Sequence, residues 1–132
     1  MIIGSLKIEA MDGDHWRVLA PGFEVNLDPE FSTPLADEFV ILIPEGFITD
    51  FASIPAPLRG SPLGHRKDTE QAAVVHDYTR RHGYLPLKNG KNVTVSEKLS
   101  DQIFKEMLKE SGVGWWRRNA MYLAVRIGSA FN

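Results

Sequence analysis

Three ionisable residues are best suited by type and spacing to do chemistry: the neighbours His76 and Asp77, and Asp101. We expect His76 and Asp77 in the middle of a helix that begins near Asp68 and ends at His82, and Asp101 near the start of the next helix. If these helices pack antiparallel, the imidazole and the Asp101 carboxylate can meet at their seam. A carboxylate that accepts the Nδ1–H bond would fix the tautomer and leave the other ring nitrogen as a base. The spacing predicts the general-base half of a hydrolase, with His76 and Asp101 as its catalytic residues.

Two carboxylates are candidate metal ligands. Asp77 adjoins the proposed base, and Asp50 opens the run Asp-Phe-Ala-Ser that ends at Ser53. Carboxylate oxygens together with one imidazole suit Mg, Mn or Zn, so a divalent cation is the candidate cofactor. Ser53 is a candidate binding residue rather than a nucleophile, because no nucleophile-elbow motif surrounds it. Asp50 has an alternative role, in which its side chain bonds the following backbone and closes a turn.

The same ionisable residues also have a structural interpretation, and the sequence leaves both open. Asp77 lies four residues before Arg81, the spacing of a helical ion pair worth a few tenths of a kcal/mol. His76 would then be a boundary residue bonded to a carbonyl group. Asp101 would strengthen the start of its helix through the helix dipole.

A third helix, predicted from about Trp115 to Ile127, suggests a binding role instead. Its predicted core face holds Trp116, Ala120, Leu123 and Ile127. Its predicted outer face carries Arg118, Tyr122 and Arg126 at i, i+4 and i+8. Trp115 joins the outer residues as a candidate interaction patch, because Trp and Arg dominate interface hot spots. The alternative function is therefore a non-enzymatic protein that binds another protein through this patch.

Three segments in this order resemble a widespread bacteriophage and prophage family of unknown function, whose members pair a T-D-F-A-S-I-P loop with a His-Asp helix. The segments are IPEGFITDFASIP at 43–55, AAVVHDY at 72–78, and SDQIF at 100–104 followed by GV at 112–113 and MYLAVR at 121–126. The resemblance covers about residues 39–128. One position departs from the family pattern, because Arg80 stands where an aromatic residue is expected. The resemblance implies a phage-encoded protein located in the cytoplasm of the bacterial host or in the virion.

The helix pair also resembles secreted phospholipase A2 in one geometric respect. There a His-Asp pair on one helix is served by an aspartate on an antiparallel helix, and the aspartate of the pair holds calcium. By that analogy, His76 would activate water, Asp101 would orient His76, and Asp77 would hold a cation. The disulfides and the usual glycine-rich calcium loop of that family are absent here, so the analogy concerns geometry alone.

The composition limits the class of protein. The chain has 132 residues, 43% of them hydrophobic, which suits a single domain spanning 1–132. The net charge of −2 argues against general nucleic-acid binding, which needs a basic excess. Cysteine is absent, which excludes disulfides, thiolate zinc sites and thiol nucleophiles. No apolar run is long enough for a transmembrane segment, and the first residues do not resemble a secretion signal.

The predicted elements give an α+β fold. Residues 1–60 are β-rich, with apolar and polar residues alternating in 15–19 and 23–27 and a fully apolar strand at 39–43. Residues 68–128 are mainly helical, interrupted by a loop or short hairpin at 84–95. Ser96 caps the second helix, whose core stripe is Leu99, Ile103, Phe104, Met107 and Leu108. We therefore expect a small antiparallel sheet from the N-terminal half, covered by two or three C-terminal helices.

Overall fold

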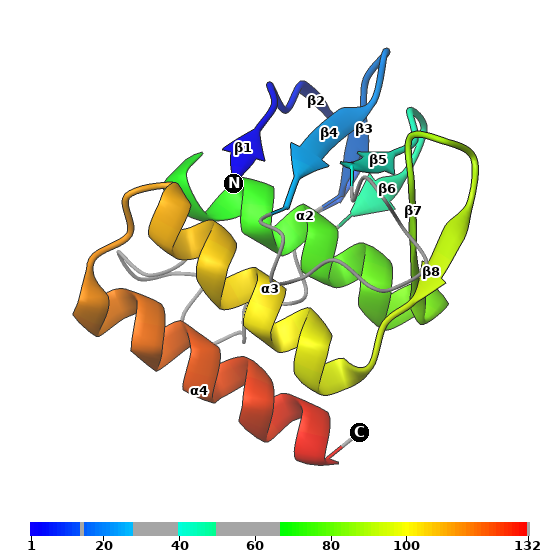
Figure 1. The fold of residues 1–132 in the computed structure, drawn as a ribbon. Helices are drawn as coiled ribbons and strands as arrows, with labels where there is room; N and C mark the ends of the chain where they lie inside the picture. The colour runs from blue at the N-terminus through cyan, green and yellow to red at the C-terminus, as the bar shows by residue number, and fades with distance from the viewer. Residues whose placement is uncertain (14, 28–39, 50–66, 132) are drawn as a thin grey trace. The chain divides into compact units, whose positions relative to one another are not determined.

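The computed structural model describes residues 1–13, 15–27, 40–49 and 67–131. Backbone contacts divide the chain into two compact units (Figure 1). The β unit takes in Met1–Asp50 and Tyr84–Thr94, and the helical unit takes in Phe51–Gly83 and Val95–Asn132. Since the N-terminal half forms small antiparallel sheets and the C-terminal half contains three helices, the predicted α+β class is confirmed.

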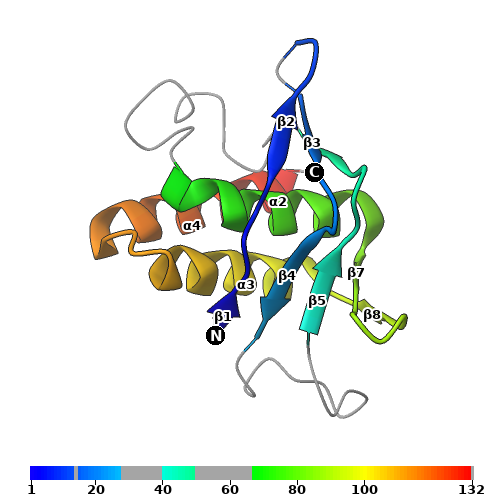
Figure 2. The ribbon, with the colours of Figure 1, turned by 90° about the horizontal axis from the view of Figure 1, so that it is seen from above.

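The β unit consists of short antiparallel strands in three small sheets. One sheet has the order β1-β4-β5, the second has β2-β3-β6, and the third is the hairpin β7-β8. Figure 2 shows β4 beside β5, which it pairs from Phe23↔Ile43 to Asn26↔Val40. In β4 the predicted alternation is present, because Phe23 and Val25 are buried while Glu24 and Asn26 are exposed. The strands are β1 (Ile2–Ile3), β2 (Ile8–Ala10), β3 (Trp16–Val18), β4 (Phe23–Asn26), β5 (Val40–Ile43), β6 (Ile48–Thr49), β7 (Tyr84–Pro86) and β8 (Asn92–Thr94).

The β7-β8 hairpin is the segment that the sequence predicted as a loop or hairpin at 84–95. Its turn contains Gly90 at φ 88°, a left-handed conformation that glycine adopts without a steric penalty. The Asn89 side chain accepts a bond from the Lys91 backbone N–H, which closes the turn. Leu87 forms a bridge to Ile41, so the hairpin contributes to the β unit although it follows a helix in the chain.

The helical unit contains α2 (Lys67–His82), α3 (Glu97–Glu110) and α4 (Trp115–Phe131). The ends of α3 follow local signals in the sequence. Ser96 accepts the Leu99 N–H bond at 3.1 Å as the N-cap, and Gly112 has φ 87° just beyond the C-cap. The predicted core stripe of α3 is confirmed, since Ile103, Phe104, Met107 and Leu108 are buried and Leu99 is partly so.

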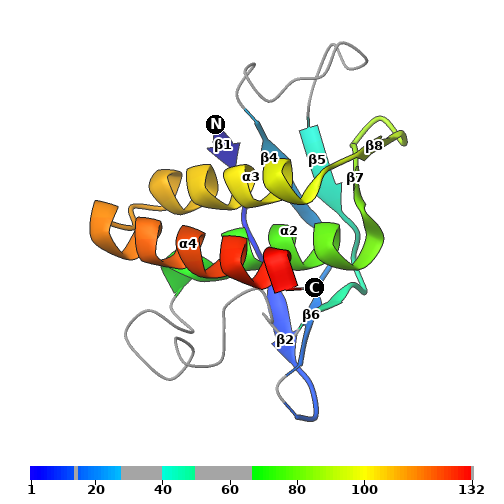
Figure 3. The ribbon, with the colours of Figure 1, turned by 90° about the horizontal axis from the view of Figure 1, so that it is seen from below.

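Side-chain contacts fix the directions of the three helices. Gln71, early in α2, meets Ser111 at the C-terminal end of α3, and Arg80, late in α2, meets Glu97 at the start of α3, so α2 and α3 are antiparallel. Asp101, early in α3, meets Arg126, late in α4, and Lys105 of α3 meets Tyr122 of α4. The two helices are therefore antiparallel, and Figure 3 shows them side by side. Residues 72–79 of α2 are all buried.

The predicted core face of α4 is wrong. Trp116, Leu123 and Ile127 are 68%, 60% and 51% exposed, whereas Met121 and Val125 are buried. The sequence correctly grouped residues that share a face, but α4 has apolar residues on two opposite faces, and periodicity does not say which one packs inward. Among the described residues, no helix is long and apolar enough to cross a membrane.

The orientation of α4 gives a stability prediction. Met121→Ala should lower the free energy of unfolding by about 2–5 kcal/mol, because it leaves a cavity at a side chain that is 1% exposed. Leu123→Ala, two residues away on the exposed face, should change it by under about 1 kcal/mol. Urea denaturation followed by circular dichroism measures both. Equal losses, or a larger loss for Leu123→Ala, would contradict the observed orientation.

Candidate functional site

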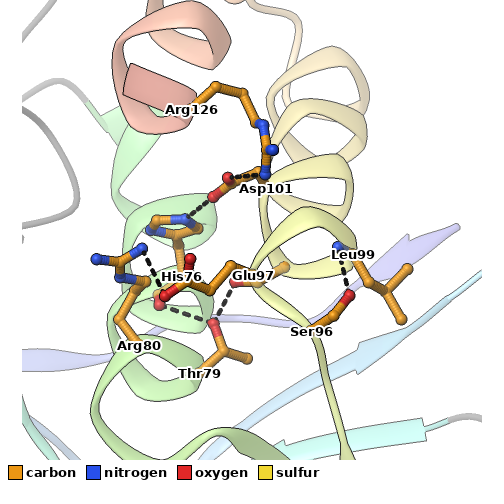
Figure 4. Close-up of polar contacts among 9 residues, drawn as sticks. His76, Thr79, Arg80, Ser96, Glu97, Leu99, Asp101 and Arg126 are labelled. Atoms are coloured by element: carbon orange, nitrogen blue, oxygen red, sulfur yellow. Dashed lines mark hydrogen bonds and ion pairs between the residues drawn. The ribbon is translucent and has the colours of Figure 1, made fainter. Parts of the chain in front are cut away.

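Three helices bring three side chains together around one buried carboxylate. Asp101 of α3 is fully buried, and its Oδ1 lies 2.5 Å from Nε2 of His76 on α2. Its Oδ2 accepts a bond of 2.9 Å from Nη1 of Arg126 on α4. Figure 4 shows Asp101 between the imidazole and the guanidinium. The structure therefore brings together His76 and Asp101, as expected from antiparallel helices, and adds Arg126.

The ring nitrogen that faces Asp101 is not the one expected. The expected bond to the carboxylate is donated by Nδ1–H, whereas Nε2 is the nitrogen within reach of Asp101. A neutral imidazole that donates through Nε2–H has its lone pair on Nδ1. The reversal follows from tertiary geometry, since the approach of α3 to α2 decides which edge of the ring the carboxylate meets.

Nδ1 of His76 is therefore the atom with unused chemical capacity. The His76 side chain is 3% exposed, and Nδ1 is buried without a hydrogen-bond partner among the described residues. The Phe104 ring lies against the imidazole, with centroids 5.0 Å apart and planes tilted by 48°. Because most buried polar atoms are bonded, a buried nitrogen of this kind is a position where a water, an ion or a ligand is expected.

Arg126 was named from the sequence as a surface binding residue, and its role in this cluster was missed. An ionised carboxylate that is fully buried needs compensation, and Arg126 supplies a charged donor opposite the imidazole. The sequence did contain an indication that Arg126 pairs with a residue outside its own helix. The predicted stripe of Arg118, Tyr122 and Arg126 lies on a helix without any acidic residue, so a carboxylate partner had to come from another element.

A pair of hydroxyl groups lies beside the imidazole at the α2–α3 contact. Thr79 donates its hydroxyl hydrogen to the backbone oxygen of His76 at 2.8 Å. Thr79 Oγ1 is also hydrogen-bonded to Ser100 Oγ, and because the Thr79 hydrogen is already used, Ser100 is the donor. At the end of the same contact, Arg80 lies 3.7 Å from Glu97 (Figure 4). The buried Thr79–Ser100 bond favours the register that brings Asp101 opposite His76.

The candidate metal ligands do not form a cluster in the part of the chain that the structure describes. There, no group of three or more His, Asp or Glu side chains is arranged to hold a metal ion. Asp77 is buried and accepts a 3.2 Å bond from Nε of Arg81, the helical ion pair of the structural interpretation. Asp50 and Ser53 lie outside the described residues.

The candidate binding residues of α4 separate into two groups. Trp115 is exposed, as predicted. Arg118, Tyr122 and Arg126 are half-buried, and each makes a contact within the helical unit. Arg118 donates to the backbone oxygen of Val113, Lys105 lies over the Tyr122 ring, and Arg126 bonds Asp101. The predicted outer stripe of α4 is therefore turned toward α3.

A family model described as a protein of unknown function (DUF1353) matches residues 25–125, about three quarters of the chain; the match includes His76 and Asp101 and ends one residue before Arg126. The chain belongs to the DUF1353 family. Neither the curated proteins nor the solved structures include a match to it. Since the description of DUF1353 proteins states no activity, any functional argument for this member has to start from the geometry of its own residues.

The buried carboxylate of this DUF1353 protein gives a second prediction. Asp101→Ala should lower the free energy of unfolding by about 3–5 kcal/mol, because it leaves the buried imidazole and Arg126 without their shared acceptor. Glu97→Gln is the matched control on the same helix, since it removes a charge from an ion pair whose Glu97 side chain is 59% exposed. It should cost under about 1 kcal/mol. Similar costs in thermal or urea unfolding would show that Asp101 is not the residue that joins the three helices.

Proposed function

We propose that this protein is a hydrolase in which His76 acts as the general base through Nδ1. The observation that carries the proposal is a buried imidazole whose Nε2 faces a carboxylate while its Nδ1 is buried without a hydrogen-bond partner among the described residues. A purely structural histidine would be expected to satisfy both nitrogens. A base needs the opposite arrangement, with one nitrogen fixed and the other carrying an available lone pair.

The chemistry follows from the three side chains. A water held at Nδ1 attacks an electrophilic carbon or phosphorus atom of the substrate, and its proton passes to Nδ1. The ring becomes an imidazolium, and Asp101 stabilises this charge through the Nε2–H bond. Nδ1 then returns the proton to the leaving group. Arg126 acts as a positioning residue, because it holds the second oxygen of Asp101 and keeps the carboxylate aimed at the ring.

The arrangement also has the two features named in the phospholipase A2 analogy. A His-Asp pair lies on α2, and a separate aspartate contacts the histidine from the antiparallel α3. The analogy would assign a cation to Asp77, and Asp50 stays a separate candidate ligand, since carboxylate oxygens suit a divalent cation. The resemblance to phage and prophage proteins supports a viral origin. We therefore propose that the protein works in the cytoplasm of the bacterial host or within the virion.

The second candidate function is binding to a host or virion protein without catalysis. The observation in its favour is Trp115, which is 69% exposed in the first turn of α4. The other residues of that predicted patch, Arg118, Tyr122 and Arg126, are engaged with neighbouring groups of the helical unit. The hydrolase is the better supported of the two functions, because its central residues converge.

His76→Gln tests the general base. The Gln amide nitrogen can take the place of Nε2 and keep the bond to Asp101, but Gln has no lone pair equivalent to that of Nδ1. We expect hydrolysis to fall by about 10²–10⁴-fold while the unfolding transition changes little. The assay compares a carboxylic ester, a phosphodiester and a short-chain phospholipid, each with and without Mg²⁺, Mn²⁺, Ca²⁺ or Zn²⁺.

Glu97→Gln provides the control for a charge or surface change near the same helix contact, and it should retain the wild-type rate. Nitrogen-15 NMR of the imidazole gives an independent readout, since the proposal requires the neutral ring to be protonated on Nε2 and not on Nδ1. Equal rates for His76→Gln and the wild type, or a neutral ring protonated on Nδ1, would refute the general-base role.

A further inference from the structure

The charges of the three clustered side chains cancel one another. The fully buried Asp101 carboxylate carries one negative charge, and the Arg126 guanidinium, bonded to its Oδ2 at 2.9 Å, carries one positive charge (Figure 4). The neutral imidazole with which the proposed mechanism begins adds no charge. The Phe104 ring, which lies against the imidazole, adds none either. The positive charge of Arg126 is therefore already matched by Asp101 before any substrate arrives.

This balance limits the kind of group that can be brought to Nδ1 of His76. The His76 side chain is only 3% exposed, so a group that reaches Nδ1 leaves most of its hydration behind. An ionised group removed from water needs an opposite charge nearby, whereas an uncharged polar group needs only hydrogen bonds. Since Asp101 and Arg126 neutralise each other, the pair has no surplus positive charge for an anion.

The charges that form during hydrolysis favour the same kind of substrate. When water attacks the carbonyl carbon of an ester, the electron pair of the C=O double bond moves to oxygen and the water proton passes to Nδ1. The negative oxygen and the positive imidazolium form together and cancel. A phosphodiester is already anionic, and attack adds a second negative charge to it. One of these charges would stay uncompensated near the Asp101 carboxylate, where like charges repel.

We propose that the substrate of this site is an uncharged carboxylic ester, an assignment that rests on the proposed role of His76 as the general base. After water has added, the carbonyl double bond re-forms and the C–O bond to the alcohol breaks. The leaving oxygen takes the proton from Nδ1, which returns the imidazole to its neutral form. One ester and one water thus give one carboxylic acid and one alcohol.

Two chromogenic compounds with the same leaving group test the substrate class: p-nitrophenyl butyrate, an uncharged ester, and bis(p-nitrophenyl) phosphate, an anionic phosphodiester. For each compound, the part of kcat/KM that is lost in His76→Gln is divided by the rate constant of spontaneous hydrolysis. This ratio measures acceleration by the site rather than the reactivity of the compound. We expect the ratio to be about 100-fold or more higher for the ester, because the phosphodiester brings an uncompensated charge into a buried site.

Asp101→Asn tests whether the charge of the cluster causes this selectivity. The variant leaves the positive charge of Arg126 unmatched, so hydrolysis of both compounds should slow while the preference for the ester falls by about tenfold. The preference is a ratio of two rates measured on one sample, so it does not depend on the fraction of folded protein. Glu97→Gln, which removes a mostly exposed charge, is the matched control and should keep the wild-type preference.

The outcomes separate the substrate class from the general base. Hydrolysis that depends on His76 but accelerates the phosphodiester as much as the ester, with or without a divalent cation, would overturn the ester assignment and leave the general base in place. An undiminished preference in Asp101→Asn would also overturn the assignment, because charge would not be its cause. If neither compound is hydrolysed in a manner that depends on His76, the general base itself fails and the ester assignment fails with it.

Discussion

The helical unit depends on one constraint, which is that the Asp101 carboxylate is fully removed from water. Burying an ionised group costs several kcal/mol unless donors replace its lost hydration. Here the replacement comes from two different helices, with the imidazole at one oxygen and the guanidinium at the other. The carboxylate therefore requires α2, α3 and α4 to be in place together, and it holds the imidazole in a fixed orientation. In the function that we propose, the same interaction that stabilises the unit would also orient His76 as a base.

Neighbouring polar contacts make this arrangement specific. The hydroxyl groups of Thr79 and Ser100 are buried and bonded to each other across the α2–α3 contact. If α3 slid by one residue along α2, these hydroxyls would separate and Asp101 would leave the imidazole. Both changes would leave buried polar groups unpaired, at about 1–3 kcal/mol for each group. The apolar stripe of α3 supplies most of the attraction between the helices, and the polar contacts select one register from those that the apolar surfaces would tolerate.

Sequence reasoning found the features that are encoded locally. Ser96 and Gly112 bound a helix through their own backbone and side-chain chemistry, and the core stripe from Ile103 to Leu108 follows from helical spacing. It also identified His76 and Asp101 as a pair across two helices, although their catalytic role stays a prediction. It was wrong about the buried face of α4 and about the ring nitrogen that meets Asp101. Both depend on how one helix is rotated against another, which is decided by tertiary packing and not by local spacing.

The two nitrogens of His76 separate the structural explanation of the cluster from the functional one. A structural role explains Nε2, because Asp101 needs a donor there. It does not explain Nδ1, since a buried polar atom without a partner costs about 1–3 kcal/mol. In the described part of the chain, the lone pair on Nδ1 of the imidazole thus accepts no hydrogen bond. A water or substrate group bound at Nδ1 would use that lone pair, and this is what a general base requires.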